Sequence, residues 1–270
     1  MIDEVYRKRV GVSRSELWRL RESPEKFKWA QKHPEPPTPA LIFGRLVHKL
    51  LLEPDAFSDE FVICPEYNRR KKAENDAYKA FCEDNAGKDI ITAADYQLDV
   101  EMTTAAKNAQ YVSRLLNGEH EKPLFWVDEL TGEACKVRLD CLTELDGRLT
   151  VIDYKTTANA STHKFNRSIF NYGYHFQAAM YCEAVKQALK LGEMPDFVFI
   201  AQEKTAPYAI NIVNVPEDVI LTGYDVFREL IGIYHECKET GCWYGYNGAF
   251  NEPNEAYLLE WVKHESDLDE

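Results

Sequence analysis

The sequence predicts an α+β fold, in which helices flank a mixed β-sheet. Three observations support this prediction. Helical patterns dominate residues 13–116, and β-rich runs separated by turn signals occupy residues 125–154. Between residues 165 and 238, helical and strand patterns then alternate. Because the first strands of the sheet lie in the middle of the chain with helices before and after them, we expect helices to cover the sheet.

Helix caps and prolines define the elements of the first third. Ser13-Arg14-Ser15-Glu16 has the Ser-x-x-Glu form of a capping box and predicts a short helix that ends near Arg21. Ser23-Pro24 predicts a second helix, with serine as the N-cap and proline at the first position. The prolines between residues 34 and 39 predict a stiff, non-helical connection. The helix that follows, at about 40–53, is apolar on much of its surface and is expected to be mostly buried.

The remaining elements follow from the same kinds of signal. Thr92 is the expected N-cap of a helix over 93–116, and Pro216 is expected to open a last long helix. Thr131-Gly132 and Asp146-Gly147 are turn signals between β-rich runs, which predicts an antiparallel meander. Strands are expected at 61–64, 125–127, 135–145, 149–154, 197–201 and 209–215, and further helices at 71–82, 165–169, 174–191 and 216–238. The tail from Gly241 is expected to wrap the surface.

The composition is that of an ordinary globular protein. Apolar residues make up 45% of the chain and charged residues 29%. No stretch reaches the roughly 20 apolar residues of a membrane helix, and the N-terminus lacks the pattern of a secretory signal. The seven cysteines include no Cys-x-x-Cys pair, so buried free thiols are expected rather than disulfides or an iron–sulfur cluster. We therefore expect a cytoplasmic protein.

The net charge of −13 at first argues against a nucleic-acid partner. The charges are unevenly distributed, however. Residues 1–30 carry eight basic and five acidic side chains, and Arg69-Arg70-Lys71-Lys72 forms a second basic cluster. An acidic protein can hold DNA if its basic side chains line one channel and its acidic side chains face outward. A solvated charged surface is the alternative, so the charge alone does not decide.

Asp140, Asp153 and Lys155 are the strongest candidates for chemistry. Asp153 and Lys155 stand two residues apart near the end of one predicted strand, so their side chains share a face. The Asp146-Gly147 turn pairs this strand with the strand that carries Asp140. Two carboxylates in a partly buried site repel each other unless a cation balances them, and Mg²⁺ prefers oxygen ligands. The lysine would add a positive charge for a phosphate, or a base for water if its pKa falls. An ion-pair ladder across the sheet is the alternative.

The pattern around these residues resembles the PD-(D/E)XK nuclease superfamily, and most closely the nuclease domain of RecE (exonuclease VIII) and its phage relatives. Asp140 and Asp153-Tyr154-Lys155 have the expected order and spacing, with Leu139 in place of a proline that the superfamily does not require. The segment Gly44–His48 matches the upstream helix, and Gln177 with Tyr181 matches the Gln-x-x-x-Tyr motif. The resemblance extends from about Gly11 to Tyr234.

The resemblance implies a restriction-endonuclease-like core and a role for each matching residue. The whole chain, 1–270, would be a single domain with N-terminal helices over 1–60, a catalytic core over about 120–240 and a C-terminal tail over 241–270. The implied metal ligands are His48, Asp140, Asp153 and the backbone carbonyl of Tyr154. Lys155 and Gln177 would orient or activate the attacking water. A histidine ligand further implies that Mn²⁺ substitutes for Mg²⁺.

The wider relationship to lambda-type exonucleases implies a DNA-binding set with a pocket for a 5′-phosphate. Its members here would be Arg9, Ser15, Arg138 and Tyr181, since an arginine fork pairs with two phosphate oxygens. Surface charge and a helix cap are the alternative roles for the first two. The family also implies a ring of three or four subunits that threads linear double-stranded DNA. Such a ring degrades one strand from 5′ to 3′ without ATP and leaves a 3′ tail for a RecT-like annealing protein.

Two other functions remain open. A RecB-like nuclease of the same superfamily would prefer single strands or cut as an endonuclease. An inactive DNA-binding or scaffold module would keep the fold alone, although the complete set of Asp140, Asp153, Lys155 and Gln177 argues against it. Glu129 and Glu133 are further acids near the predicted hairpin that could approach a metal. The acidic segment 265–270 is either a disordered tail or a partner contact.

Overall fold

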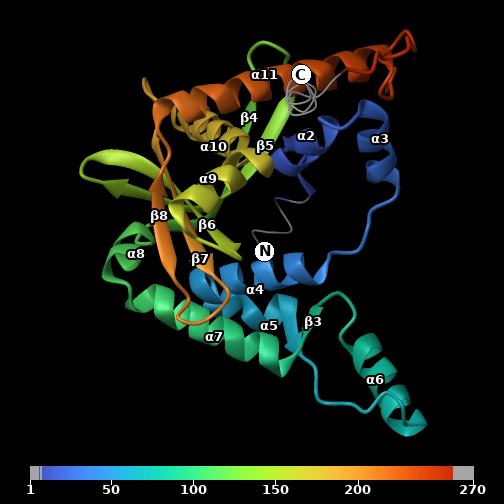
Figure 1. The fold of residues 1–270 in the computed structure, drawn as a ribbon, viewed down its shortest axis with the longest axis vertical. Coiled ribbons are helices and arrows are strands. Elements are labelled where there is room, and N and C mark those ends of the chain that lie inside the picture. Colours follow the sequence, from blue (N-terminus) through green and yellow to red (C-terminus); the bar gives the residue numbers. More distant parts are fainter. Residues whose placement is uncertain (1–5, 7, 258–270) are drawn as a thin grey trace, which may run out of the picture.

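A computed structural model describes residue 6 and residues 8–257 and contains a six-stranded sheet, a two-stranded sheet and helices around both (Figure 1). The larger sheet consists of β1 (Val12–Ser13), β4 (Glu119–Val127), β5 (Ala134–Leu145), β6 (Arg148–Thr157), β7 (Asp196–Glu203) and β8 (Ile210–Asn214). The smaller sheet pairs β2 (Phe61–Ile63) with β3 (Asp89–Ile91) in parallel. The predicted segment 265–270 lies outside the described residues.

The helices lie before, between and after the strands, as predicted. Those before β4 are α2 (Arg14–Leu20), α3 (Pro24–Lys32), α4 (Pro39–Leu52), the 3₁₀ turn η1 (Pro54–Ala56), α5 (Phe57–Glu60), α6 (Lys72–Asp84), α7 (Ala93–Asn108) and α8 (Gln110–Leu115). Those after β6 are α9 (Thr162–Asn171), α10 (Tyr174–Leu189) and α11 (Glu217–Thr240). None of the helices in the described part of the chain combines the length and apolarity needed to cross a membrane.

The large sheet is mixed, which confirms the predicted fold class. β4, β5 and β6 form the predicted antiparallel meander. β7 then pairs in parallel with β6, and β8 pairs antiparallel with β7. Cys135 and Cys141 both pair with β4, and on their other side they pair with β1 and β6 respectively. β1 and β6 therefore share one edge of β5, with a gap between them.

Two apolar cores sandwich the sheet, as Figure 1 shows by the helices on either side of it. On one face, α2, α9, α10 and α11 cover residues such as Val151, Phe197 and Phe199. On the other face, α4, α7 and α8 cover Ile152 and Ile200, among others. Successive residues of β6 and β7 alternate between the two cores, as expected for strands that are buried on both faces. The odd-numbered residues of β6, which include Asp153 and Lys155, therefore belong to the α10 face.

Most predicted elements differ from the structure by one to three residues at an end, and the bounds of three elements illustrate why. The helix expected over 93–116 is divided at Ala109, whose backbone is extended. The division reorients the last turn so that Val112 and Leu115 are buried against the sheet. The strand expected at 125–127 begins at Glu119, since Pro123 is tolerated in β4, which pairs with β5 alone. The helix expected at 165–169 extends over Thr162–Asn171.

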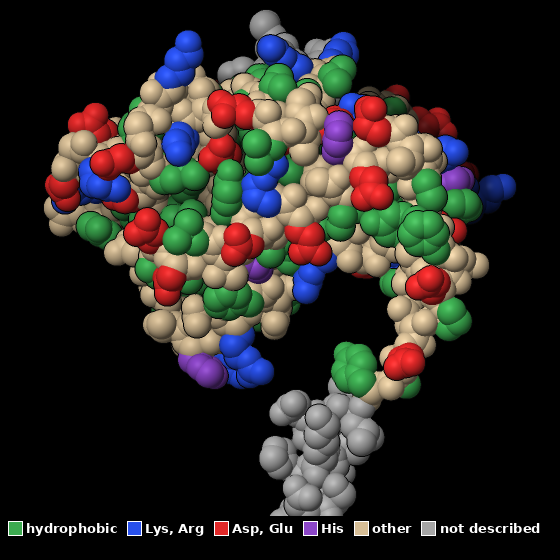
Figure 2. Space-filling model, turned by 90° about the horizontal axis from the view of Figure 1, so that it is seen from above, with side chains coloured by type: hydrophobic (Ala, Val, Ile, Leu, Met, Phe, Trp, Pro, Cys, Tyr) green, Lys and Arg blue, Asp and Glu red, His purple; other side chains and the backbone are tan. Residues whose placement is uncertain are grey.

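The tail was expected to wrap the surface, and only its first part does so. Trp243 stacks on Phe27 of α3, with ring centroids 5.4 Å apart, and contacts Tyr234 of α11. From Tyr246 to Tyr257 every side chain is exposed. Viewed from the side of α11, the last described residues extend from the body beside an open hollow (Figure 2). Acidic, basic and apolar side chains are intermixed over the described part of this face.

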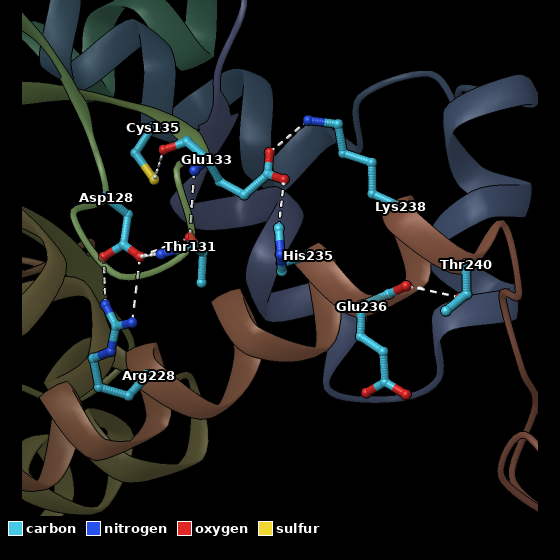
Figure 3. Close-up of polar contacts among 9 residues, drawn as sticks. All are labelled: Asp128, Thr131, Glu133, Cys135, Arg228, His235, Glu236, Lys238 and Thr240. Atoms are coloured by element: carbon cyan, nitrogen blue, oxygen red, sulfur yellow. Dashed lines mark hydrogen bonds and ion pairs between the residues drawn. The ribbon is translucent and has the colours of Figure 1, made fainter.

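The hairpin between β4 and β5 is tied to α11 by two groups of polar contacts (Figure 3). Arg228 binds Asp128 through both carboxylate oxygens, and Thr131 donates to the same carboxylate at 2.6 Å. Glu133 accepts from Lys238 at 2.6 Å and contacts His235 at 3.1 Å. Asp128 and Glu133 are both buried. These contacts fix the meander that carries Asp140 against the longest helix of the fold.

Candidate active site

The residues predicted for chemistry meet where β5 and β6 separate. The ladder between these strands ends at the pair Cys141↔Ile152, and one further step of the same register places Asp140 opposite Asp153. Beyond this point β6 continues to Thr157 beside β7 alone. The Tyr154 amide donates to Asp140 Oδ2 at 2.8 Å, so a side chain bridges the two strands where the backbone ladder stops. The Lys155 ammonium lies 2.5 Å from Asp153 Oδ2.

β5 changes its orientation at Asp140. Cys135, Val137 and Leu139 belong to the core on the α10 face, whereas Cys141 belongs to the core on the α4 face. Opposite Asp140 on β4 stands Glu121, whose φ of 47° lies in the left-handed region. A non-glycine residue in this region is uncommon and costs about 1–3 kcal/mol. The local strain coincides with the position where acidic side chains gather.

Helix α4 supplies His48. Thr38 caps this helix and Pro39 occupies its first turn, so its start is well defined. Val47 and Leu51 are buried in the core that also contains Tyr154. His48 Nε2 lies 2.9 Å from the Tyr154 carbonyl oxygen, and His48 Nδ1 lies 3.5 Å from Asp140 Oδ1. The histidine thus contacts two of the predicted ligands.

Helix α10 supplies Gln177 from its first turn. The Gln177 amide donates to Asp153 Oδ1, so Gln177 and Lys155 hold opposite oxygens of one carboxylate. Gly173 precedes the helix with a φ of 68°, and a Cβ at this position would lie 2.5 Å from the Trp18 ring. Glycine is therefore required for the chain to enter α10 at this point. Tyr181, one turn after Gln177, packs against the sheet, where its ring contacts Phe197.

Glu121 belongs to this site although it is not among the residues predicted from the sequence. Its side chain is buried, and one oxygen accepts from Arg138 Nε at 2.7 Å. Arg138 was predicted to share the face of Asp140 and to join a phosphate pocket. Both residues line a cavity of about 300 Å³, the fork cavity, together with His48, Lys155 and Thr156. The sequence signal is misleading here: a two-residue turn at Thr131-Gly132 would place Glu121 opposite Leu142, whereas the observed register, with the loop 128–133, places it opposite Asp140.

Burial and mutual charge set the protonation of the site. Burial raises the pKa of Asp153 to about 6, and burial together with the charge of Asp140 raises that of Glu121 to about 7. Burial alone would lower the pKa of His48, but Asp140 outweighs it and the pKa rises to about 9. Similarly, the aspartates outweigh burial and raise the pKa of Lys155. Burial and mutual repulsion thus disfavour the charged form of these acidic side chains, and positive charge beside them is needed to balance it.

The donor atoms fit a hard divalent cation. His48, Glu121 and Asp140 each offer one ligand atom, and the three atoms lie within 4.8 Å of one another. The Tyr154 carbonyl, held by His48, is adjacent to this group. Carboxylate and carbonyl oxygens suit Mg²⁺, and an added imidazole suits Mn²⁺. His48, Asp140 and the Tyr154 carbonyl belong to the predicted ligand set, Glu121 is an addition to it, and Asp153 is engaged by Lys155 and Gln177.

The other predicted DNA-binding residues lie at varying distances from this centre. Arg9 is exposed, and its guanidinium lies over the Phe125 ring of β4 at 4.4 Å. Ser15 is exposed in α2, with its hydroxyl 3.3 Å from that of Ser13. Arg138 lines the fork cavity, whereas Arg9 and Ser15 do not. Of the two acids near the hairpin, Glu133 is engaged by α11, and Glu129 lines a separate cavity beside Arg228.

The fold and the gathered residues define a nuclease-type domain of the PD-(D/E)XK class. The chain belongs to the family described as a PDDEXK-like domain of unknown function (DUF3799), which matches residues 13–252. A candidate exonuclease from Eubacterium rectale has the same fold, with a TM-score of 0.58 and 14% identity over 97% of this chain and 94% of that chain. The structure of the protein SSO0001 matches over 70% of this chain and 85% of that chain, at 15% identity and a TM-score of 0.31. Among curated proteins, none is significantly similar.

These findings confirm the predicted PD-(D/E)XK fold and are consistent with a RecE-like nuclease domain. The family description concerns the fold, and the structural similarity at 14% identity is likewise a similarity of fold. The roles of individual residues must therefore be argued from the geometry of this chain.

Proposed function

We propose that the protein is a metal-dependent exodeoxyribonuclease that acts on the ends of linear double-stranded DNA from 5′ to 3′. The observation that carries this proposal is the set of direct contacts that joins His48 to Asp140 and Asp153 to Lys155 and Gln177. His48 and Lys155 also line the fork cavity. A phosphodiester hydrolase needs a positioned water, positive charge near the phosphate oxygens and ligands for a cation. Side chains of these types are all present. The fold shared with a candidate exonuclease is in accord with this proposal.

Each residue has a role in the proposal that follows from its contacts. His48, Glu121, Asp140 and the Tyr154 carbonyl would hold Mg²⁺, for which Mn²⁺ would substitute. When bound, the ion supplies charge stabilisation for the phosphate and lowers the pKa of a bound water. Lys155, whose pKa the aspartates raise, would act as an ammonium group that neutralises charge on the phosphate. Gln177 would hold the Asp153 carboxylate in one orientation, and Asp153 would orient the attacking water.

The finer features of the proposal follow from the resemblance to RecE and lambda-type exonucleases. Arg138 would contact the terminal 5′-phosphate inside the fork cavity, while Arg9, Ser15 and Tyr181 would belong to the wider DNA-binding set. A ring of three or four subunits would thread the duplex and require no ATP. It would leave a 3′ single-stranded tail for a RecT-like annealing protein, and the reaction would take place in the cytoplasm.

Digestion of end-labelled linear duplex tests this proposal. The DNA is 5′-phosphorylated and labelled on each strand in turn, and is incubated with Mg²⁺ or with EDTA. We expect loss from the 5′ ends only, and no loss in EDTA or with Lys155→Ala. Lys186→Ala, which removes a lysine from the far end of α10, is the control and should digest as wild type does. Nicking of closed circles without loss from linear ends would instead indicate an endonuclease. No cleavage of any substrate would refute the nuclease proposal.

A further inference from the structure

A second cavity adjoins the fork cavity. It has a volume of about 580 Å³ and is lined by the end of β6, by α9 and by Lys204 after β7. We refer to it as the α9 cavity. Thr156 and Tyr174 line both cavities, so the two are neighbours across these residues. A substrate strand held at Asp153 and Lys155 would therefore reach the α9 cavity within a short distance.

The charge of the α9 cavity is opposite to that of the protein. Lys164, Arg167 and Lys204 line it, and none of its lining residues is acidic. Within residues 6 and 8–257, no carboxylate lies within ion-pair distance of these three side chains. In a chain with 45 acidic and 32 basic residues, this cavity thus gathers three cations and no carboxylate. An anionic ligand would explain why their charge is left uncompensated.

The remaining lining residues also suit a nucleic-acid strand. Tyr172 is 60% exposed and stands 5.8 Å from Tyr174, measured between ring centroids. The Arg14 guanidinium donates to the carbonyl oxygens of Tyr172 and Gly173, which fixes the backbone beneath this exposed ring. Asn159, Ser168 and Asn171 add neutral hydrogen-bonding groups. Proteins that bind single strands combine such a basic groove with aromatic rings on which bases stack.

We propose that the α9 cavity binds a single-stranded segment of the DNA next to the scissile phosphate, with the backbone phosphates on Lys164, Arg167 and Lys204 and a base on Tyr172. Lys164 and Arg167 are three residues apart in α9 and therefore project from the same side of the helix. A duplex presents its bases stacked in pairs, whereas a frayed or single strand can place one base on an exposed ring. This inference rests on the proposed function, because it assigns a further part of the same substrate.

Binding measured without catalysis tests the inference. Fluorescence anisotropy in EDTA compares a labelled 20-nucleotide single strand with a blunt duplex of the same sequence. For Lys164→Ala/Arg167→Ala/Lys204→Ala, we expect weaker binding of the single strand and a slope of log Kd against log salt that is smaller by about 2, if each side chain contacts one phosphate. Tyr172→Ala should weaken single-strand binding about five- to hundredfold, and Tyr172→Phe should restore it.

The control variant is Lys186→Ala, which removes a cation from the last turns of α10. Its affinity and salt slope should equal those of wild type. Wild-type affinity in both the triple variant and Tyr172→Ala would overturn the inference, as would an equal loss for duplex and single strand. Failure of wild type to bind any DNA would overturn it as well. Normal digestion of duplex ends by the triple variant, with unchanged affinity, would reject the α9 cavity and leave the nuclease proposal intact. If the variants bind the single strand more weakly but wild type cleaves no DNA, the nuclease proposal is rejected and the α9 cavity remains a binding site.

Discussion

Glu121 is the residue whose position adds most to the site that the sequence predicted. It stands opposite Asp140, is buried, and has a strained backbone and an Arg138 partner. A surface glutamate on an edge strand needs none of these features. Together with His48 and Asp140 it provides the donor atoms that lie nearest to one another in the site. These features are in accord with the proposed role of Glu121 in metal binding.

Replacement of Glu121 tests this role without a need for activity. We expect Glu121→Gln to weaken Mn²⁺ binding by about tenfold or more, because one anionic donor is lost from a buried site. Isothermal titration calorimetry of the DNA-free protein measures the change. Glu119→Gln is the matched control, since Glu119 lies on the same strand with 67% of its side chain exposed. Equal affinities for the two variants would exclude Glu121 from the metal site.

At the residue level, the position of Asp140 beside Asp153 could be predicted from the sequence, whereas that of Glu121 could not. Asp140 and Asp153 could be predicted to meet because the Asp146-Gly147 turn fixes the register between their strands. Glu121 could not be found by extending the other hairpin, because the loop 128–133 is longer than a Thr131-Gly132 turn and shifts the register. Pro123 and its charged or polar neighbours also obscured the start of β4. Its left-handed backbone has no signal in the sequence, since glutamate rarely adopts this conformation.

At the element level, the close approach of α10 and α11 fixes the helix that carries Gln177. A Cβ on Gly223 of α11 would lie 2.1 Å from the His175 carbonyl oxygen in the first turn of α10. Gly232, two to three turns further along α11, has no atom within 4 Å of its own Cβ position. One helix thus contains a glycine that the packing requires and a glycine that it does not.

These two glycines make a matched pair of substitutions. We expect Gly223→Ala to destabilise the fold by about 1–3 kcal/mol, because α10 must shift to admit the methyl group. Gly232→Ala should leave stability unchanged or raise it by up to about 1 kcal/mol, since alanine is the better helix former. Urea unfolding followed by circular dichroism measures both. A similar effect for both substitutions would mean that the helix contact is looser than the structure indicates.

The contacts between the hairpin and α11 predict a dependence of stability on pH. Burial alone would raise the pKa of Asp128, but the hydrogen bonds from Arg228 and Thr131 outweigh it and lower the pKa. Because the folded-state pKa lies below the unfolded value, this carboxylate contributes stability above about pH 4, and the contribution disappears as the pH falls further. Asp128→Asn should cost about 2 kcal/mol at pH 7.

The difference in melting temperature between wild type and Asp128→Asn measures this contribution across pH. We expect the difference to be largest near neutral pH. It should shrink below about pH 4, as the Asp128 carboxyl of wild type becomes protonated and loses its charge. A difference that stays constant from pH 7 to pH 3 would show that the loss comes from packing and not from the carboxylate charge.

The sequence signals for elements succeeded where they were local. The two turn signals predicted the meander, and capping residues predicted the starts of α2, α3 and α7. The prolines between residues 34 and 39 placed the start of α4. The break at Ala109 could not be predicted in this way, because what favours it is the burial of Val112 and Leu115 against a sheet that forms from later residues. The parallel pair of β2 and β3 likewise depends on contacts between segments that are far apart in sequence.

At the level of the whole molecule, the net charge is a poor guide to where charged side chains gather. The chain carries −13 in total, and the face on the side of α11 mixes both signs (Figure 2). The basic side chains of the α9 cavity come from α9 and from the segment after β7, which no window of the sequence brings together. Local gathering of charge by the fold, and not the total, determines where an anionic polymer can bind.

A metal that binds only the folded chain should stabilise the whole molecule. At a concentration one hundred times its Kd, Mn²⁺ would contribute about 2.7 kcal/mol, which corresponds to roughly 5–10 °C in melting temperature for a chain of this size. Differential scanning calorimetry with and without EDTA measures the shift. We expect no shift in Asp140→Asn. A shift of equal size in that variant would place the stabilising ion elsewhere.

The seven cysteines are divided by burial in a way that has a practical use. Cys135, Cys141, Cys182 and Cys237 are buried, Cys64 and Cys82 are partly buried, and Cys242 is exposed. Cys242 lies just after α11, in the segment that precedes the exposed tail. Serine substitutions at 64 and 82 would leave one accessible thiol. A maleimide dye at this position would then allow single-molecule fluorescence to follow the protein along DNA while the sheet and both cavities stay unmodified.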